Sequence, residues 1–92
     1  MKIDIETLIY HLHECSIATL GTHSLHCEGY PFVTVVPVAL DEMHRPVILI
    51  SRLAEHTKNL LADPRTSVLM YKESTDNVLA DKRVTLVGKM FP

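Results

Sequence analysis

Five short segments of the chain are rich in β-branched and other apolar residues, and turn-forming residues separate them. Short apolar runs of this kind predict β-strands. The strands are expected at residues 16–22, 30–40, 47–50, 65–72 and 83–91. Gly21 is expected to break the first strand. Pro37, which has no N–H to donate, marks an edge or a bulge where the second strand bends around a barrel.

Two other segments repeat apolar residues at helical spacing. Asp4 is a suitable N-cap for a helix over residues 4–14, whose apolar positions are Ile5, Leu8, Ile9 and Leu12. A second helix is expected over residues 54–63, and Pro64 ends it. Its apolar face is predicted to hold Leu53, Thr57, Leu60 and Leu61. Its other side is predicted to hold Glu55, Lys58, Asn59 and Ala62.

These elements predict one small, mainly β domain with minor α content over residues 1–92. Only one helix falls between strands, so an antiparallel sheet or barrel is expected rather than a doubly wound fold. Residues 41–45 are expected to form a hairpin turn. Residues 73–81 form a polar connection with room for one helical turn near Val78 and Leu79. The last strand has no following neighbour, so a partner subunit is expected to complete a shortened domain.

Residues 47–64 place a strand end, a serine, an arginine and a helix N-terminus at one point. The run 47–50 predicts a buried strand, which would deliver Ser51 and Arg52 to the start of the second helix. Unpaired N–H groups and the helix dipole favour a phosphate there, and Arg52 or Lys58 can neutralise it. The alternative is that Ser51 caps a turn while both cations are solvated.

Composition excludes several other classes of function. A formal charge of −2 and few aromatic residues give no case for nucleic-acid binding, and no apolar run approaches a membrane span of about 20 residues. The charged, amphipathic N-terminus is not a secretory signal. Cys15 and Cys27 are expected to be free thiols in a cytoplasmic protein. The loop that holds His23, His26 and Cys27 lacks metal-motif spacing, so no metal site is predicted.

Four segments together resemble a known family: ATLGT, GYPFVTVVPVALDE, PVILISRLAEHTKNLLADPRTSVLMY and RVTLVGKM. Over about residues 14–90 the chain is similar to the N-terminal half of the pyridoxamine 5′-phosphate oxidase-like, FMN-binding split barrels. Within that family it most resembles the haem-utilisation (HugZ/HutZ-like) subgroup. The block SRLAEHTKNLLADPR is the most specific part of the match. The resemblance implies an antiparallel split β-barrel and a homodimer with cofactor at the subunit interface.

The resemblance also implies positions for the FMN cofactor. Backbone groups of Thr34, Val35 and Val36 would face the isoalloxazine ring. The strand end at Ile50 and Ser51 would reach the flavin phosphate. The remaining phosphate-binding positions of the family correspond to Arg52, His56, Thr57 and Lys58.

The chain also departs from the family pattern. The oxidases carry a basic residue early in the second strand, where this chain has Phe32 and Val33. Their substrate-binding residues, like the iron ligand of the haem-degrading members, come from a C-terminal region beyond this chain. The functions left open are therefore an FMN-dependent oxidoreductase, a haem-binding or haem-utilisation protein, and a dimeric barrel without cofactor or enzymatic activity. No catalytic residue is assigned, and none of the six histidines carries over as an iron ligand.

Overall fold

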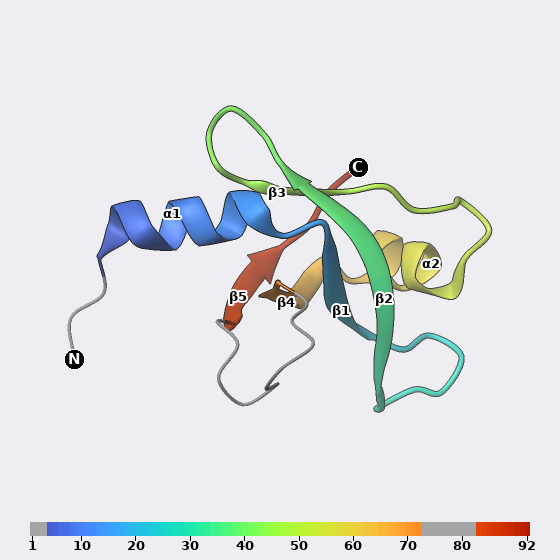
Figure 1. Ribbon diagram of the computed structural model, residues 1–92. Coiled ribbons are helices and arrows are strands. Elements are labelled where there is room, and N and C mark those ends of the chain that lie inside the picture. Colours follow the sequence, from blue (N-terminus) through green and yellow to red (C-terminus); the bar gives the residue numbers. More distant parts are fainter. Residues whose placement is uncertain (1–3, 73–82) are drawn as a thin grey trace.

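The computed structural model describes residues 4–72 and 83–92. The helical turn expected near Val78 and Leu79 lies outside the described residues. Two helices and five strands follow one another in the expected order (Figure 1). They are α1 (Ile5–Glu14), β1 (Ile17–His23), β2 (Pro31–Leu40), β3 (Pro46–Ile48), α2 (Glu55–Ala62), β4 (Arg65–Tyr71) and β5 (Arg83–Lys89). Neither helix has the length and apolar character that crossing a membrane requires.

All strand pairs are antiparallel, and the order across the sheet is β3-β2-β1-β4-β5. The predicted antiparallel, mainly β fold is therefore confirmed. Gly21 does not break β1, because its extended backbone pairs with Val33 on one side and with Ser67 on the other. The prediction of a break at Gly21 was wrong, since glycine also fits a regular strand flanked by two neighbours.

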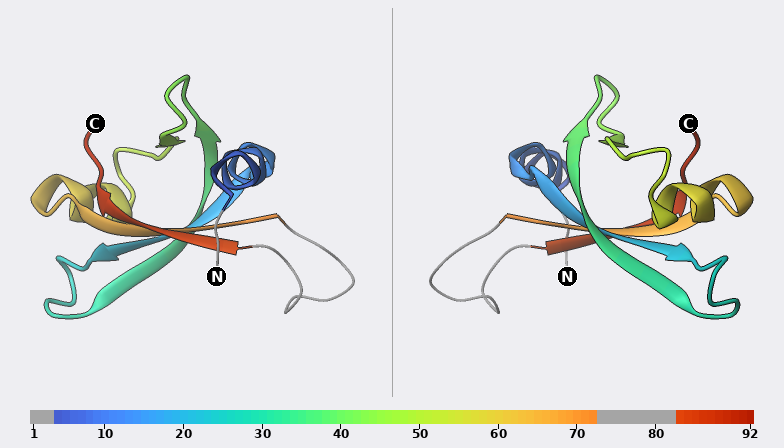
Figure 2. Two further views of the ribbon diagram at one scale, coloured as in Figure 1. Left: turned by 90° about the vertical axis from the view of Figure 1, so that its left-hand side faces the viewer. Right: turned by 90° about the vertical axis from the view of Figure 1, so that its right-hand side faces the viewer.

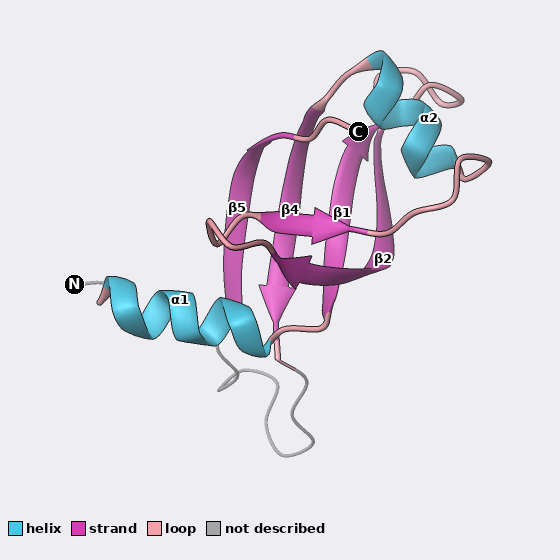
Figure 3. Ribbon diagram, turned by 90° about the horizontal axis from the view of Figure 1, so that it is seen from above, coloured by secondary structure: helices cyan, strands magenta, loops and turns pink. Residues whose placement is uncertain are grey.

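The second strand gains a second partner, β3, on its other edge just after Pro37. Residues 31–37 of β2 pair with β1, whereas residues 38–40 pair with β3. Figures 1 and 2 show that β2 curves strongly, and Figure 3 shows its last part and β3 crossing in front of β1, β4 and β5. The curvature of β2 agrees with a strand that bends around a barrel, and a bend at Pro37 itself stays a prediction. A residue without an N–H group suits a place where the hydrogen-bonded ladder changes.

The core lies inside this half-barrel. Figure 3 places α1 and α2 at opposite ends of the sheet. The buried apolar side chains are Leu12, Cys15, Ala18, Leu20, Val36, Val38, Leu60, Val68 and Met70. The barrel stays open between its two edge strands, β3 and β5, where Arg45, Pro46 and Leu86 help to line a cleft of about 420 Å³.

Helix α1 begins as predicted. The Asp4 carboxylate accepts the N–H of Glu6 at 3.1 Å and the hydroxyl of Thr7 at 2.8 Å, so Asp4 is the N-cap. Leu12 reaches the core, and Leu8 packs against it. His11 is buried next to Leu12, and its Nε2 has no hydrogen-bond partner among the described residues.

The strand predicted at residues 47–50 is shorter than expected and is not buried. β3 covers only Pro46–Ile48 and lies at an edge of the sheet. Val47 and Leu49 are exposed, while Ile48 and Ile50 pack against the core. The uninterrupted apolar run therefore has two different faces. Only one of them meets the core, because successive side chains of an extended chain point to opposite faces.

The buried face of α2 also differs from the prediction. Leu53 and Leu61 are 85% and 67% exposed, whereas Asn59 and Leu60 are only 1% and 8% exposed. The prediction placed Asn59 on the polar side, which was wrong because its amide is satisfied inside the protein. Its Nδ2 donates to the Thr22 hydroxyl at 3.1 Å, and its Oδ1 accepts the Leu25 N–H at 3.0 Å. These bonds turn Leu61 toward solvent.

An ion pair in the turn after α2 makes a first testable prediction. The Arg65 guanidinium donates two close hydrogen bonds to the Asp63 carboxylate, at 2.7 and 3.0 Å, and the pKa of Asp63 falls to about 2. The contribution of this pair to the free energy of unfolding is fully present when the pH is above the unfolded-state pKa near 3.8. It is lost as the pH falls through about 2. The urea midpoints of the wild type and of Asp63→Asn should therefore converge between pH 4 and pH 2. A gap that stays constant over this range would contradict the prediction.

Candidate functional site

The turn that leads into α2 presents donors for an anion. The Ser51 hydroxyl accepts the N–H of Leu53 at 3.2 Å, so its own proton is directed elsewhere. The Ser51 carbonyl accepts the N–H of Ala54 at 3.2 Å and also the Thr57 hydroxyl. Ala54 is the N-cap of the helix, and no side chain in the described ranges caps it. The first N–H groups of α2 and the positive end of its dipole therefore remain available to a negatively charged group.

Arg52 is the cation best placed to join these donors. It is exposed, and it makes no ion pair within residues 4–72 and 83–92. Lys58 lies 3.7 Å from Glu55, so its charge is already partly balanced. Of the two cations predicted to neutralise a phosphate, Arg52 is therefore the one that is free to do so.

A groove beside α2 brings part of the predicted site together. We call it the α2 groove. It has a volume of about 260 Å³ and is lined by Ile48, Leu49, Ile50, Arg52, Thr57, Leu60, Leu61, Met90, Phe91 and Pro92. Among the predicted cofactor positions it contains Ile50, Arg52 and Thr57. Its walls are apolar except for Arg52 and Thr57, so it suits an apolar ligand that carries an anionic group.

Met90 and Phe91 were not predicted to belong to the site. The Met90 N–H bonds to the Pro64 carbonyl at 2.9 Å, which extends the pairing of β4 and β5 beyond Lys89 and brings both residues beside α2. The only signal in the sequence was an apolar pair after the last strand. That signal does not say which helix the pair meets.

The free edge of β2 offers a second set of backbone groups. Hydrogen bonds from Val38 to Ser16 and from Ser24 to Tyr30 set the alternation of the β1–β2 ladder. Even-numbered residues of β2, including Thr34 and Val36, therefore bond to β1. Val35 directs its N–H and C=O to the other side, where the described chain supplies no strand. Of the three positions predicted to face a flavin ring, Val35 alone has free backbone groups, because an antiparallel strand alternates its bonding directions.

His56 lies apart from the predicted phosphate contacts. It is half-buried on the side of α2 that carries Asn59 and Leu60, and it does not line the α2 groove. Its Nε2 is buried without a hydrogen-bond partner in the described part of the chain. Of the predicted positions on α2, the groove therefore contains Thr57 and not His56.

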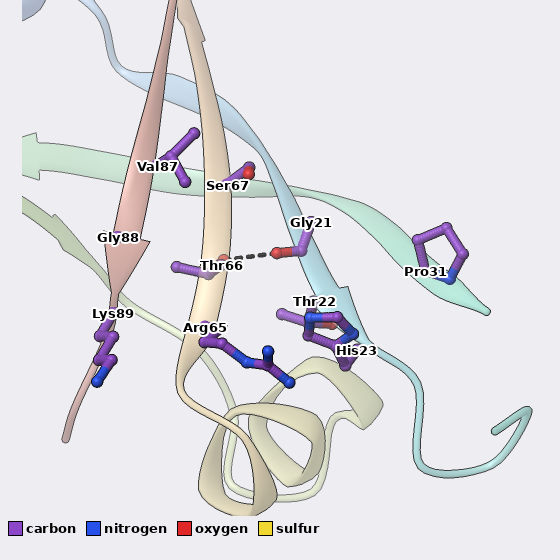
Figure 4. A pocket seen from close by; sticks show the side chains of 10 residues that line it. All are labelled: Gly21, Thr22, His23, Pro31, Arg65, Thr66, Ser67, Val87, Gly88 and Lys89. Atoms are coloured by element: carbon purple, nitrogen blue, oxygen red, sulfur yellow. Dashed lines mark hydrogen bonds between the residues drawn. The ribbon is translucent and has the colours of Figure 1, made fainter. Parts of the chain in front are cut away.

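A second groove lies at the ends of four strands, β1, β2, β4 and β5 (Figure 4). Its volume is about 490 Å³, and it is lined by Gly21, Thr22, His23, Pro31, Arg65, Thr66, Ser67, Val87, Gly88 and Lys89. The Thr66 hydroxyl donates to the Gly21 carbonyl at 2.5 Å across its floor. Three basic side chains point from its rim, but Arg65 is bound by Asp63. None of the predicted site residues lines this groove.

The cysteines do not contribute to either groove. Cys15 is buried and Cys27 is exposed, and both are free. Burial raises the pKa of the Cys15 thiol, which makes it a poor nucleophile. Three or more His, Cys, Asp or Glu side chains do not cluster for a metal ion anywhere in the described ranges.

Known proteins share this fold and much of the sequence. A chloroplastic heme oxygenase of Arabidopsis thaliana is 41% identical over 69 residues, which are 75% of this chain and 21% of that protein. A heme-binding protein of Mycobacterium smegmatis matches 97% of this chain and 36% of its own, at 30% identity and a TM-score of 0.80. The heme storage protein HutZ of Vibrio cholerae matches 97% of this chain and 61% of its own, at 25% identity and a TM-score of 0.73.

The chain thus spans about a fifth of the length of the plant relative and less than two thirds of either solved structure. The solved structures confirm the split-barrel fold, of which this chain forms a half-barrel. The family model for pyridoxamine 5′-phosphate oxidase matches residues 6–90, which is nearly the whole chain. The chain therefore belongs to the pyridoxamine 5′-phosphate oxidase family, and its relatives include haem-binding and haem-utilisation proteins.

Proposed function

We propose that the chain binds haem in the α2 groove and serves in haem utilisation. The observation that carries the proposal is that three relatives from a plant and two bacteria, similar over 75–97% of this chain, have haem in their names. The groove supports it, because a haem has an apolar ring and carboxylates at its edge. Arg52 and the Ser51 hydroxyl would hold a carboxylate, while Leu60, Met90 and Ile50 would contact the ring.

The proposal covers binding and not haem degradation. No histidine of this chain corresponds to the iron ligand of the family, and no described histidine lines the α2 groove. His56, with a buried and unbonded Nε2, is the histidine closest in sequence to the groove residues. Haem oxygenation by this chain would need an iron ligand and an electron donor, and we assign neither among the residues that line the α2 groove.

We further propose that the binding unit is a homodimer. Ligand pockets for molecules of this size have volumes of roughly 300–1,000 Å³, so a groove of about 260 Å³ holds only part of one. The outward face of the sheet exposes Val33, Val35 and Val87, which a second copy would cover. The free edge of β2 at Val35 would then lie at the subunit interface. The free cysteines are in keeping with the cytoplasm as the compartment.

FMN is the second candidate, and a specific observation favours it. The Ser51 hydroxyl, the uncapped start of α2 and the unpaired Arg52 form a phosphate-binding arrangement close to Thr57, as in the family's flavin-binding pattern. Val35 would supply the one free backbone contact to the flavin ring. Bound FMN would make this chain a flavin-dependent oxidoreductase, with the flavin carrying out the redox chemistry.

Absorption spectroscopy of the purified full chain tests these proposals. The protein is titrated with haemin and, separately, with FMN, and its mass in solution is measured in each state. A Soret band that saturates at one haem per chain or per dimer supports the first proposal. Saturable quenching of FMN fluorescence without a haem spectrum replaces it with the second. If neither signal is observed, both proposals are overturned, and a dimeric barrel without a cofactor remains.

Arg52→Ala should weaken binding of either ligand by about tenfold to 150-fold. A charge-assisted hydrogen bond to a carboxylate or phosphate contributes roughly 1.5–3 kcal/mol, and alanine removes it. Lys58→Ala is the matched control, because it removes the same charge from a side chain already paired with Glu55. Equal losses in the two variants would show that overall charge, and not a contact from Arg52, attracts the ligand.

A further inference from the structure

Three basic residues form a row across the outward face of the sheet, at the ends of β5, β4 and β1. Residues directly opposite each other in an antiparallel pair lie on the same face. Lys89 is opposite Arg65, and the β1–β4 register, which pairs Gly21 with Ser67, places His23 opposite Arg65 on the other side. All three are exposed, and we call them the basic row. Figure 4 shows them side by side along the groove of about 490 Å³.

The floor of this groove is made of small residues. Two positions along each strand from the basic row, Ser67 is paired with Val87 on one side and with Gly21 on the other. Val87 is 81% exposed and forms a wall beside the floor. Gly21 has no positive φ, and a Cβ added to it would meet the Ser67 carbonyl oxygen at 3.6 Å, which is an ordinary contact. The fold therefore does not require glycine here, and glycine inside a strand often marks a place where a ligand approaches the backbone.

The basic row carries a positive charge that the described chain does not balance. Arg65 donates from Nε and Nη2 to Asp63, which fixes the guanidinium and leaves its Nη1 without a partner in the described chain. Lys89 makes no ion pair within residues 4–72 and 83–92. None of the described residues that line the groove is acidic. Like charges directly opposite each other destabilise a sheet, so an anion between Lys89 and Arg65 would relieve their repulsion.

We propose that this groove binds a small amphipathic oxyanion, that is, a carboxylate or a phosphate monoester with an apolar body. The oxyanion would accept hydrogen bonds from the Lys89 ammonium and from Nη1 of Arg65. The apolar body would lie over Gly21 and against Val87. The volume of about 490 Å³ lies within the range of roughly 300–1,000 Å³ that is usual for small-molecule sites.

This site is separate from the one proposed for haem or FMN. The two grooves share no lining residue, so a failure of one proposal leaves the other intact. The homodimer proposed above would cover Val33 and Val87. It would leave the basic row, two residues farther along the strands, at the rim of the interface.

Three variants separate the contributions of charge and shape. Lys89→Gln removes the unbalanced charge and keeps most of the side-chain length. Gly21→Val fills the floor with a residue that strands favour. Asp63→Asn removes the carboxylate that competes with a ligand for Arg65. The matched control is Lys72→Gln, which makes the same change as Lys89→Gln in an exposed side chain outside the groove.

Nuclear magnetic resonance titration of the ¹⁵N-labelled full chain with phenyl phosphate and, separately, with benzoate tests the site. Inorganic phosphate and acetate are the matched ligands without an apolar body. We expect saturable shifts of the Gly21 and Lys89 amide signals, and at least threefold tighter binding of each aromatic ligand than of its small counterpart. Lys89→Gln and Gly21→Val should each weaken binding at least fivefold, and Asp63→Asn should tighten it. The tighter of the two aromatic ligands identifies the oxyanion.

Circular dichroism verifies that each variant folds. Unchanged affinity in both Lys89→Gln and Gly21→Val would overturn the proposal. So would an equal loss in Lys72→Gln, because overall charge would then account for the attraction. Shifts confined to residues of the α2 groove would also overturn it, since they would place the oxyanion in that groove alone.

Discussion

Replacing Leu60 with alanine should lower the free energy of unfolding by about 2–5 kcal/mol, whereas replacing Leu61 should change it by less than about 0.5 kcal/mol. The two residues are neighbours on α2, yet Leu60 is 8% exposed and Leu61 is 67% exposed. Alanine at position 60 would leave a cavity in the core cluster shared with Leu20 and Met70. Alanine at position 61 would remove only surface that water already contacts.

Urea denaturation at one pH measures both variants, with the wild type alongside. Because the substitutions are chemically identical, their difference reports burial alone and not helix propensity. A stability of about 5–15 kcal/mol is usual for a folded domain, so the loss at Leu60 should also lower the thermal midpoint by many degrees. Equal losses at the two positions would restore the face predicted from periodicity, which holds both residues. A larger loss at Leu61 would show that α2 presents a different face to the sheet.

The strand and helix positions could be predicted because they depend on local patterns. Alternation and β-branched runs identified the strands, and Asp4 with the following apolar repeat identified α1. The split barrel followed from a resemblance carried by the block that includes Ser51 and Arg52. Each of these signals lies within a short window of sequence, where the side chains themselves determine the preferred conformation.

The orientation of each element could not be predicted in the same way, because it depends on distant partners. Asn59 is buried because Thr22 and Leu25, more than 30 positions away, satisfy its amide. Leu49 is exposed just beyond the end of β3, although its sequence reads as a buried run. The sequence around a polar residue in a helix, or around an apolar residue in a strand, is the same whether that side chain is buried or exposed. Local pattern therefore does not predict its burial.

The candidate site likewise combines residues that local sequence predicts with residues that only the fold brings together. Arg52 and Thr57 were found in sequence because they adjoin one helix start, and the α2 groove contains both. Met90 and Phe91 complete that groove only because β5 pairs with β4 and continues past Pro64. The hydrogen bond between the rings of His13 and His44, with 2.9 Å between Nε2 and Nδ1, likewise requires α1 to lie against the β2–β3 hairpin. No local pattern encodes that contact.

The amide of Asn59 provides the second large effect that we expect. Asn59→Leu keeps the number and branching of the side-chain heavy atoms but removes both bonds, which leaves the Leu25 N–H without its acceptor and Thr22 without its donor. An unsatisfied buried polar group costs about 1–3 kcal/mol, so the loss of stability should be about 2–4 kcal/mol. The amide hydrogen of Leu25 should then exchange with solvent faster than in the wild type.

A double-mutant cycle with Thr22→Val identifies the cause. Thr22→Val removes the hydroxyl that accepts from the Asn59 amide, and the double variant removes both partners of that bond. If the bond itself stabilises α2 on the sheet, the double variant should lose at least 0.5 kcal/mol less than the sum of the single losses. Strictly additive losses would mean that the bond to Thr22 does not stabilise α2, and that Asn59 acts through the Leu25 N–H and packing. Lys58→Ala, one position away on the exposed side of α2, should leave stability nearly unchanged, because an exposed ion pair contributes little.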